Sequence, residues 1–207
     1  QPKSGMFALF KHYPKEAFTV LFLTAGGTLA FYTYTTYLQK YLVNTSGFTK
    51  PEATQITTLA LFIFMCLQPV AGALSDRIGR KPLMIFFGIT GVLFTYVLFD
   101  ALANTHNYWT AFWLCFGGLV MVTGYTSINA VVKAELFPAH IRALGVALPY
   151  AIANTLFGGT AEFFALSFKE AGHESWYFIY VSIMIFISLI IYIFMKDTKH
   201  HSKIKEH

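Results

Sequence analysis

Six long stretches of the chain are built almost entirely from apolar residues. They cover residues 17–39, 54–75, 83–99, 108–132, 143–168 and 176–195. The hydrocarbon core of a bilayer is about 30 Å thick, and a helix of roughly 20 apolar residues crosses it. Because no water reaches that region to bond the backbone, each stretch must be a helix. The pattern therefore predicts an all-α integral membrane fold with six transmembrane helices.

The overall composition agrees with this pattern. Hydrophobic residues make up 56% of the chain and charged residues 12%, whereas a soluble domain carries about 25% charged residues. A transmembrane β-barrel would need apolar and polar residues to alternate over about 10 residues, and these stretches are continuous instead. Most of the chain is therefore expected to face the lipid bilayer or other protein rather than water.

The basic residues predict how the helices are oriented. If the connections are numbered alternately, twelve of the 15 Lys and Arg residues fall on the side of the N-terminus, including Lys133 and Arg142 in the loop after the fourth stretch. Only Lys40, Lys50 and Lys169 fall on the other side. Since basic residues concentrate in cytoplasmic loops, both termini are expected in the cytoplasm. The net charge of +5 then reflects topology and attraction to anionic lipid, and nucleic acid is not an expected partner.

The ends of the chain are expected to be polar and cytoplasmic. Residues 1–16 have no pattern of a secretory signal and are interpreted as a loop remnant, residues 17–196 as the six-helix transmembrane half, and residues 197–207 as a tail. Cys66 and Cys115 fall inside apolar stretches, where packing is the favoured role. The sequence has no Cys/His pattern of a metal site, so neither a metal nor another cofactor is expected.

The connection between the second and third stretches carries the most specific motif, GALSDRIGRKP at residues 72–82. Gly79 allows a tight turn with unusual backbone angles, and Pro82 suits the first turn of the next helix. Asp76 stands at the membrane boundary, where it can pair with an arginine or accept from a helix N-terminus. An ordinary basic loop would not require this joint spacing.

This motif resembles the signature G-x-x-x-D-R-x-G-R-[KR] of the major facilitator superfamily. In that superfamily it lies between the second and third helices of each six-helix half, and it has the same place here. The resemblance implies a gate that holds the cytoplasmic side closed and does not touch substrate. The residues that the resemblance assigns to this gate motif are Gly72, Asp76, Arg77, Gly79, Arg80 and Lys81.

Three further segments narrow the resemblance. They are FYTYTTYLQKYLVNT at residues 31–45, KAELFPAHIRALGV at 133–146, and FGGTAE at 157–162. Together they resemble the C-terminal half of the alpha-ketoglutarate permeases, in the metabolite:proton symporter family of that superfamily. This implies a bacterial inner-membrane symporter of 2-oxoglutarate and protons with twelve helices, of which the chain supplies helices 7–12. The missing N-terminal half would be a partner, and substrate would bind between the halves.

Polar side chains in the first stretch recur at helical spacing. Thr28, Tyr32, Thr35 or Thr36, and Gln39 share one face, and hydroxyl groups can donate to a carboxylate. Because polar groups in a bilayer tend to face a cavity or the bundle interior, Tyr32, Thr35 and Gln39 are candidate substrate-pathway residues. The alternative is an interface belt, to which Tyr41 is assigned, with hydrogen bonds between helices.

The second and fourth stretches carry fewer polar groups. Gln68 precedes Pro69, which frees a backbone carbonyl, and a bond from Gln68 to that carbonyl is favoured over a ligand role. Tyr125, Thr126 and Asn129 share a face of the fourth stretch. Tyr125 and Asn129 are candidates for the substrate pathway, although bridging between helices explains this face slightly better.

The fifth stretch has the clearest polar stripe, since Tyr150, Asn154, Gly158 and Glu162 follow at intervals of four. Tyr150 and Asn154 are candidate pathway residues. Glu162 is the only acid well inside a stretch, and because burial in lipid disfavours a carboxylate it is the candidate proton carrier. The alternative is that Glu162 pairs with Lys40 or lies near the outer water boundary. Lys40 itself is expected to snorkel to the interface, or else to attract an anionic substrate.

Three functions follow from the sequence. The leading hypothesis is a proton-coupled dicarboxylate carrier of which this chain is one half. The second keeps the transporter but changes the cargo to another metabolite or a zwitterionic osmolyte, and the third is a half-length remnant that does not transport. An enzyme is not expected, because the sequence has no nucleophile–base pair, metal cluster or phosphate-binding loop.

Overall fold

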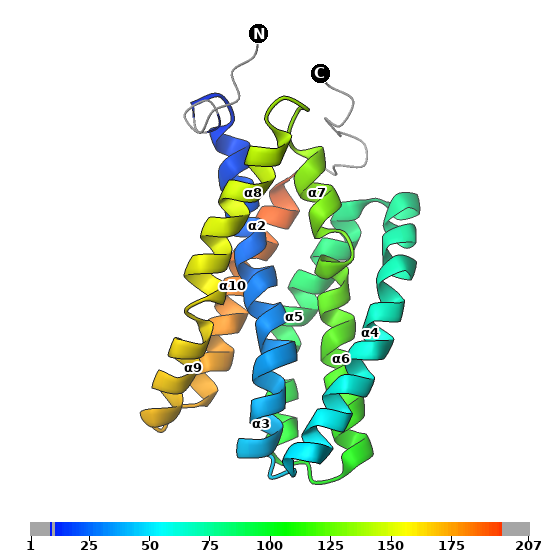
Figure 1. Ribbon diagram of the computed structural model, residues 1–207, viewed down its shortest axis with the longest axis vertical. Helices are drawn as coiled ribbons and strands as arrows, with labels where there is room; N and C mark the ends of the chain where they lie inside the picture. Colours follow the sequence, from blue (N-terminus) through cyan, green and yellow to red (C-terminus); the bar gives the residue numbers. More distant parts are fainter. Residues whose placement is uncertain (1–8, 10, 196–207) are drawn as a thin grey trace.

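The computed structural model describes Leu9 and residues 11–195. Within these residues all regular structure is helical, and the helices run up and down in one bundle (Figure 1). Most of the predicted loop remnant, residues 1–8 and 10, and the whole predicted tail, residues 197–207, lie outside the described residues. The elements are α2 (Pro14–Tyr32), η1 (Thr33–Tyr37), α3 (Leu38–Asn44), α4 (Lys50–Ile78), α5 (Arg80–Ala103), α6 (Tyr108–Thr126), α7 (Asn129–Glu135), α8 (Arg142–Ala153), η2 (Asn154–Gly158), α9 (Ala161–Glu170) and α10 (Ser175–Phe194).

Five of the six predicted spans are present as helical runs that are long and apolar enough to cross a membrane. These runs are Pro14–Asn44, Lys50–Ile78, Arg80–Ala103, Tyr108–Glu135 and Ser175–Phe194. The prediction of an all-α membrane fold is confirmed. Three of the runs, Pro14–Asn44, Lys50–Ile78 and Arg80–Ala103, extend beyond the apolar stretches at both ends, because polar residues continue the helices.

The remaining predicted span, the fifth stretch at residues 143–168, differs from the prediction because it is not one helix. It consists of α8, η2 and α9, which follow one another along the same side of the bundle (Figure 1). Pro149 lies inside α8 and supplies no backbone N–H. The η2 segment is a π-helix, and the N–H of Gly159 bonds back to the carbonyl of Asn154 at 2.8 Å. The Gly158–Gly159 pair thus breaks the α-helical pattern in the middle of the span.

Two of the five long runs also contain irregular segments. The first run passes through the π-helix η1 between α2 and α3. The run Tyr108–Glu135 includes a turn at Ser127 and Ile128, between α6 and α7. Irregular backbone inside a membrane protein is tolerated where it is buried in protein or lines a cavity. We therefore expect these two segments to face other protein or a cavity and not lipid.

Helices α5 and α10 pack closely through small residues, as membrane helices do. Leu189 lies against Gly88, and Ile185 lies against Gly91. Both helices lie at the back of the view in Figure 1, behind α2, α4, α6 and α8. Their exposed side chains are mostly large and apolar, including Leu93 on α5, which is what a surface in contact with lipid requires.

Helix α2 is the centre of the bundle. Its Gly26 N–H donates to Ser188 Oγ at 2.9 Å, and Ser188 donates in turn to the Phe22 carbonyl at 2.7 Å, which ties α2 to α10. On another side, the ring of Tyr125 from α6 fills the space over Gly27. Glycine allows this approach because a larger residue would hold the two helices apart.

The turn between α4 and α5 follows the prediction from its glycine. Gly79 has φ of +100°, ends α4 and precedes α5, whose first turn contains Pro82. Side chains other than glycine rarely adopt this conformation. The turn lies at the end of the bundle where α2 begins and α10 ends, which we call the motif end (Figure 1).

The contact between Gly27 and Tyr125 gives a stability prediction. A methyl group on Gly27 would overlap the Tyr125 ring, whereas one on Gly117 of α6 would meet no atom within 4 Å. Gly27→Ala is expected to lower the free energy of unfolding by about 1–3 kcal/mol, because overpacking forces the ring out of place. Gly117→Ala is the control and is expected to be neutral or stabilising by up to about 1 kcal/mol. Thermal unfolding of the chain in detergent measures both, and equal effects would contradict the packing.

Candidate functional site

At the motif end, Arg80 joins the gate motif to the end of α7. Its NH1 donates to Asp76 Oδ1 at 2.5 Å and to Ser75 Oγ at 2.8 Å, and its Nε donates to Glu135 Oε1 at 3.0 Å. The Asp76 carboxylate is mostly exposed, whereas the Glu135 side chain is 3% exposed. One arginine therefore holds two carboxylates, a superficial one on its own turn and a buried one on another helix.

The predicted pairing of Asp76 with an arginine is confirmed, and the second partner is new. Glu135 lies within the segment at residues 133–146, but the sequence predicted no role for it. No sequence signal could have found this pair, because Glu135 and Arg80 are 55 residues apart. In the structure Glu135 is 2% exposed, and a buried carboxylate needs a cation. Arg142 fixes the same loop by donating from Nε to the carbonyls of Ala134 and Phe137, at 3.1 and 3.2 Å.

Midway along the bundle, polar side chains from α2, α6, α7, α8 and η2 lie together. Lys133 Nζ donates to the Tyr125 hydroxyl at 3.1 Å and lies 4.2 Å from the centre of the Tyr150 ring. Thr28 and Asn129 also lie within reach of the Tyr125 hydroxyl. Thr28 donates to Asn154 Oδ1 at 3.1 Å. We call these residues the central polar cluster: Thr28, Tyr125, Asn129, Lys133, Tyr150 and Asn154.

The cluster contains four predicted pathway residues, Tyr125, Asn129, Tyr150 and Asn154, and one residue that the sequence misplaced. Lys133 was counted among the loop cations, and that placement is wrong, because the residue is 2% exposed inside the bundle. The apolar stretch ends at residue 132, which made Lys133 look like the first loop residue. The turn at Ser127 and Ile128 instead begins a new helix, α7, on which Lys133 points inward.

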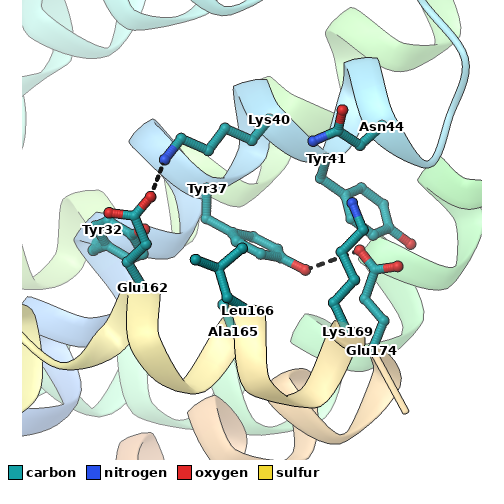
Figure 2. A pocket seen from close by; sticks show the side chains of 10 residues that line it. All are labelled: Tyr32, Tyr37, Lys40, Tyr41, Asn44, Glu162, Ala165, Leu166, Lys169 and Glu174. Atoms are coloured by element: carbon teal, nitrogen blue, oxygen red, sulfur yellow. Dashed lines mark hydrogen bonds and ion pairs between the residues drawn. The ribbon is translucent and has the colours of Figure 1, made fainter. Parts of the chain in front are cut away.

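At the end opposite the motif end, a pocket lies between α3 and α9 (Figure 2). Lys40 forms an ion pair with Glu162 across the pocket, and both side chains are about half exposed. Tyr37 donates its hydroxyl to Glu174 Oε1 at 3.2 Å, a bond also drawn in Figure 2. The predicted alternative for Glu162, a pair with Lys40, is therefore what the structure contains.

The remaining pathway candidates of the first span have different surroundings. The Tyr32 hydroxyl is buried and has no hydrogen-bond partner, and it lies close to Glu162 and Lys40. Thr35 donates to the Phe31 carbonyl of its own helix at 2.6 Å. Gln39 donates to Thr54 Oγ1 on α4 at 3.0 Å. Of the three, only Tyr32 lines the pocket.

The glutamine of the second span has a structural role, but the prediction that it bonds the carbonyl that Pro69 leaves free is wrong. Gln68 Nε2 donates to the carbonyl of Phe64 at 3.0 Å. The Gln68 Oε1 atom accepts from the Thr126 hydroxyl on α6 at 2.8 Å, and this bond bridges α4 and α6. The carbonyl that Gln68 bonds is one residue before Met65, whose partner Pro69 removes, so that bond stiffens the helix beside the proline without replacing the lost one.

The chemistry available in these sites is electrostatic. Among the described residues no three His, Cys, Asp or Glu side chains are grouped so as to hold a metal ion. What the structure offers is three cations at three depths, each with different partners: Arg80, Lys133 and Lys40. Such groups bind and release anions or protons, and they mark transport pathways in membrane proteins.

Comparison with known proteins identifies the family of the chain. The chain matches the family model of sugar (and other) transporters over residues 3–206. It is 50% identical to the alpha-ketoglutarate permease of Escherichia coli (strain K12) over 172 residues, which is 83% of this chain and 40% of that protein. It is 27% identical to the glycine betaine/proline/ectoine/pipecolic acid transporter OusA of Dickeya dadantii, over 90% of this chain and 37% of the relative. A citrate-proton symporter of Klebsiella pneumoniae is 27% identical over 67% of the chain and 31% of its own length.

The chain spans less than half the length of these curated relatives. No solved structure matches it. The helices and the transporter relatives together identify an integral membrane protein of the bacterial inner membrane. The chain therefore belongs to the sugar (and other) transporter family, within the major facilitator superfamily that its gate motif indicated.

Proposed function

We propose that the chain is the C-terminal six-helix half of a proton-coupled symporter of 2-oxoglutarate or a related dicarboxylate, with both termini in the cytoplasm. The observation that carries the proposal is the 50% identity to the E. coli alpha-ketoglutarate permease over 172 residues. The chain covers 40% of that relative, so the preceding six helices are its partner. Substrate binds near the midplane between the two halves, and one half rocks against the other.

The central polar cluster supports this proposal. Its residues come from α2, α6, α7, α8 and η2, and several are partly exposed although they lie midway along membrane helices. Polar groups at that depth face a watered cavity or another protein rather than lipid. The face that carries them is therefore the one that meets the other half and the cargo.

The Lys40–Glu162 pair supplies a route for proton coupling. The pocket around it also contains the Tyr32 hydroxyl, Lys169 and Glu174. When Glu162 takes up a proton, its attraction to Lys40 is lost, and Lys40 is released to attract an anion at this end. Proton binding and anion entry are thereby linked at one pair, as symport requires.

A second candidate changes only the cargo, to a zwitterionic osmolyte. It rests on the 27% identity to the transporter from Dickeya dadantii. The third hypothesis, a remnant that does not transport, gives no function to the central polar cluster. Both are alternative outcomes of the experiment that follows.

Uptake measurements test the proposed function. The assembled transporter, meaning this chain together with the preceding six-helix half, is expressed in cells that lack their own 2-oxoglutarate permease. Uptake of labelled 2-oxoglutarate is expected to stop when a protonophore collapses the proton gradient, and unlabelled succinate is expected to compete. Competition by glycine betaine or proline, without competition by dicarboxylates, would favour the second candidate. Absence of uptake of every labelled compound would favour the remnant.

Glu162→Gln tests the coupling pair. Glutamine keeps the shape of the side chain but carries no proton, so the variant is expected to exchange internal for external substrate and not to accumulate it. Glu170→Gln is the matched control, because Glu170 is an exposed acid on the same helix, α9. Accumulation and exchange are measured in the same vesicles. Accumulation that still follows the proton gradient in Glu162→Gln would remove Glu162 from the mechanism.

The gate motif gives a paired prediction for Asp76→Asn and Glu135→Gln. Both remove a partner of Arg80, but the Glu135 pair is buried and the Asp76 carboxylate is exposed. Breaking a buried pair costs several times more than breaking a surface pair. Glu135→Gln is therefore expected to lower the maximal uptake rate on the order of tenfold and Asp76→Asn less, with KM changed by no more than about twofold in either. A KM effect larger than the rate effect would mean that these residues contact substrate.

A further inference from the structure

Lys133 is a buried cation whose partners among the described residues are all neutral. Its side chain is 2% exposed, Nζ donates to the Tyr125 hydroxyl at 3.1 Å, and the Tyr150 ring centre lies 4.2 Å away. The Tyr125 ring centre is the next contact, at 5.5 Å. One hydrogen bond and two aromatic rings solvate the ammonium only in part, because it has three N–H donors.

Two other cations in the described part of the chain do have carboxylate partners. Lys40 pairs with Glu162, and Arg80 pairs with Asp76 and Glu135. Glu135 is two residues from Lys133 but is bonded to Arg80, so it does not serve the lysine. A buried charge without a counter-ion is costly, and in membrane proteins such groups are retained at substrate and ion sites.

Tyr150 separates the ammonium from the face of the bundle. The Tyr150 side chain is 39% exposed, and its ring lies over the ammonium. One helical turn further along, Asn154 accepts from Thr28 through Oδ1, which leaves its amide N–H groups as donors. Rotation of the Tyr150 ring about its side-chain bonds would uncover Lys133 beside these donors without moving a helix.

We propose that Lys133 binds a carboxylate group of the transported anion, with Tyr150 covering the ammonium when the anion is absent. The proposal rests on the proposed function, since it assumes that the cargo is anionic. The chemical class it specifies is a small aliphatic carboxylate, held by the ammonium, the Tyr125 hydroxyl and the Asn154 amide. A second carboxylate of the cargo would extend toward the other half of the transporter.

Substitution of Lys133 by methionine tests the proposal on the assembled transporter. Methionine keeps the apolar stem and removes the charge. Lys50→Met is the matched control, because Lys50 is exposed at the start of α4, far from the cluster along the chain. The thermal unfolding temperature of the purified protein is measured with and without 2-oxoglutarate, with succinate, and with glycine betaine, and KM for 2-oxoglutarate uptake is measured in cells.

The proposal makes three expectations for Lys133→Met. Without anion its unfolding temperature equals or exceeds that of the unsubstituted protein, because an uncompensated buried charge has been removed. The rise in unfolding temperature produced by 2-oxoglutarate and by succinate disappears. KM for 2-oxoglutarate rises at least about 30-fold, as loss of one partner of a buried charge pair requires. Lys50→Met keeps both the anion-induced rise and the KM.

Each other outcome counts against a specific statement. A lower unfolding temperature of Lys133→Met without anion, or an anion-induced rise and KM equal to those of Lys50→Met, overturns the role of Lys133. If the unsubstituted transporter takes up 2-oxoglutarate in that case, the proposed function stands. If the unsubstituted protein is stabilised by the anion but shows no uptake, the proposed function fails and the thermal measurement still decides the role of Lys133. Stabilisation by glycine betaine alone overturns both.

Discussion

The structure depends on one constraint, which is that no water satisfies polar groups in the middle of the bundle. Many of its threonines solve this within their own helix, as Thr33 and Thr95 do by donating to the carbonyls of Leu29 and Gly91. Ser188 solves it between helices by bonding the backbone of α2. Several polar groups that have neither solution lie in the central polar cluster, where they bond one another. The apolar exposed surfaces of α5 and α10 are the counterpart of that gathering.

This constraint explains why the cations at three depths have such different partners. Arg80, at the motif end, is held by two carboxylates and therefore keeps two elements of the chain together. Lys40, at the other end, has one carboxylate, and both groups are half exposed, so the pair can separate at small cost. Lys133 lies between them with no carboxylate partner among the described residues. A charge that is fully compensated holds a structure in place, and a charge that is only partly compensated is available to bind a ligand.

The parts that were predictable from the sequence are those set by local physics. The thickness of the bilayer set the length of the apolar runs, and the short spacing of Asp76 and Arg80 across the turn at Gly79 allowed that ion pair. The Lys40–Glu162 pair could be anticipated as an alternative because both residues fall near the same end. The position of Lys133 could not, because residue 132 ends the apolar run and nothing in the spacing reveals that the turn at Ser127 redirects the next helix. The Glu135 pair was equally hidden, since its partner is 55 residues away.

The two runs that contain the π-helical segments η1 and η2 contact each other at two points. Thr28 on α2 bonds Asn154 at the start of η2, and Lys40 on α3 pairs with Glu162 on α9. The run from α2 to α3 and the run from α8 to α9 are therefore joined on both sides of η1, once in the central polar cluster and once in the pocket of Figure 2. A π-helical turn bonds its backbone less regularly than an α-helix and is frequent at functional sites. The Thr28–Asn154 bond and the Lys40–Glu162 pair thus lie on either side of η1, and Asn154 is about one turn from Tyr150, whose ring covers Lys133.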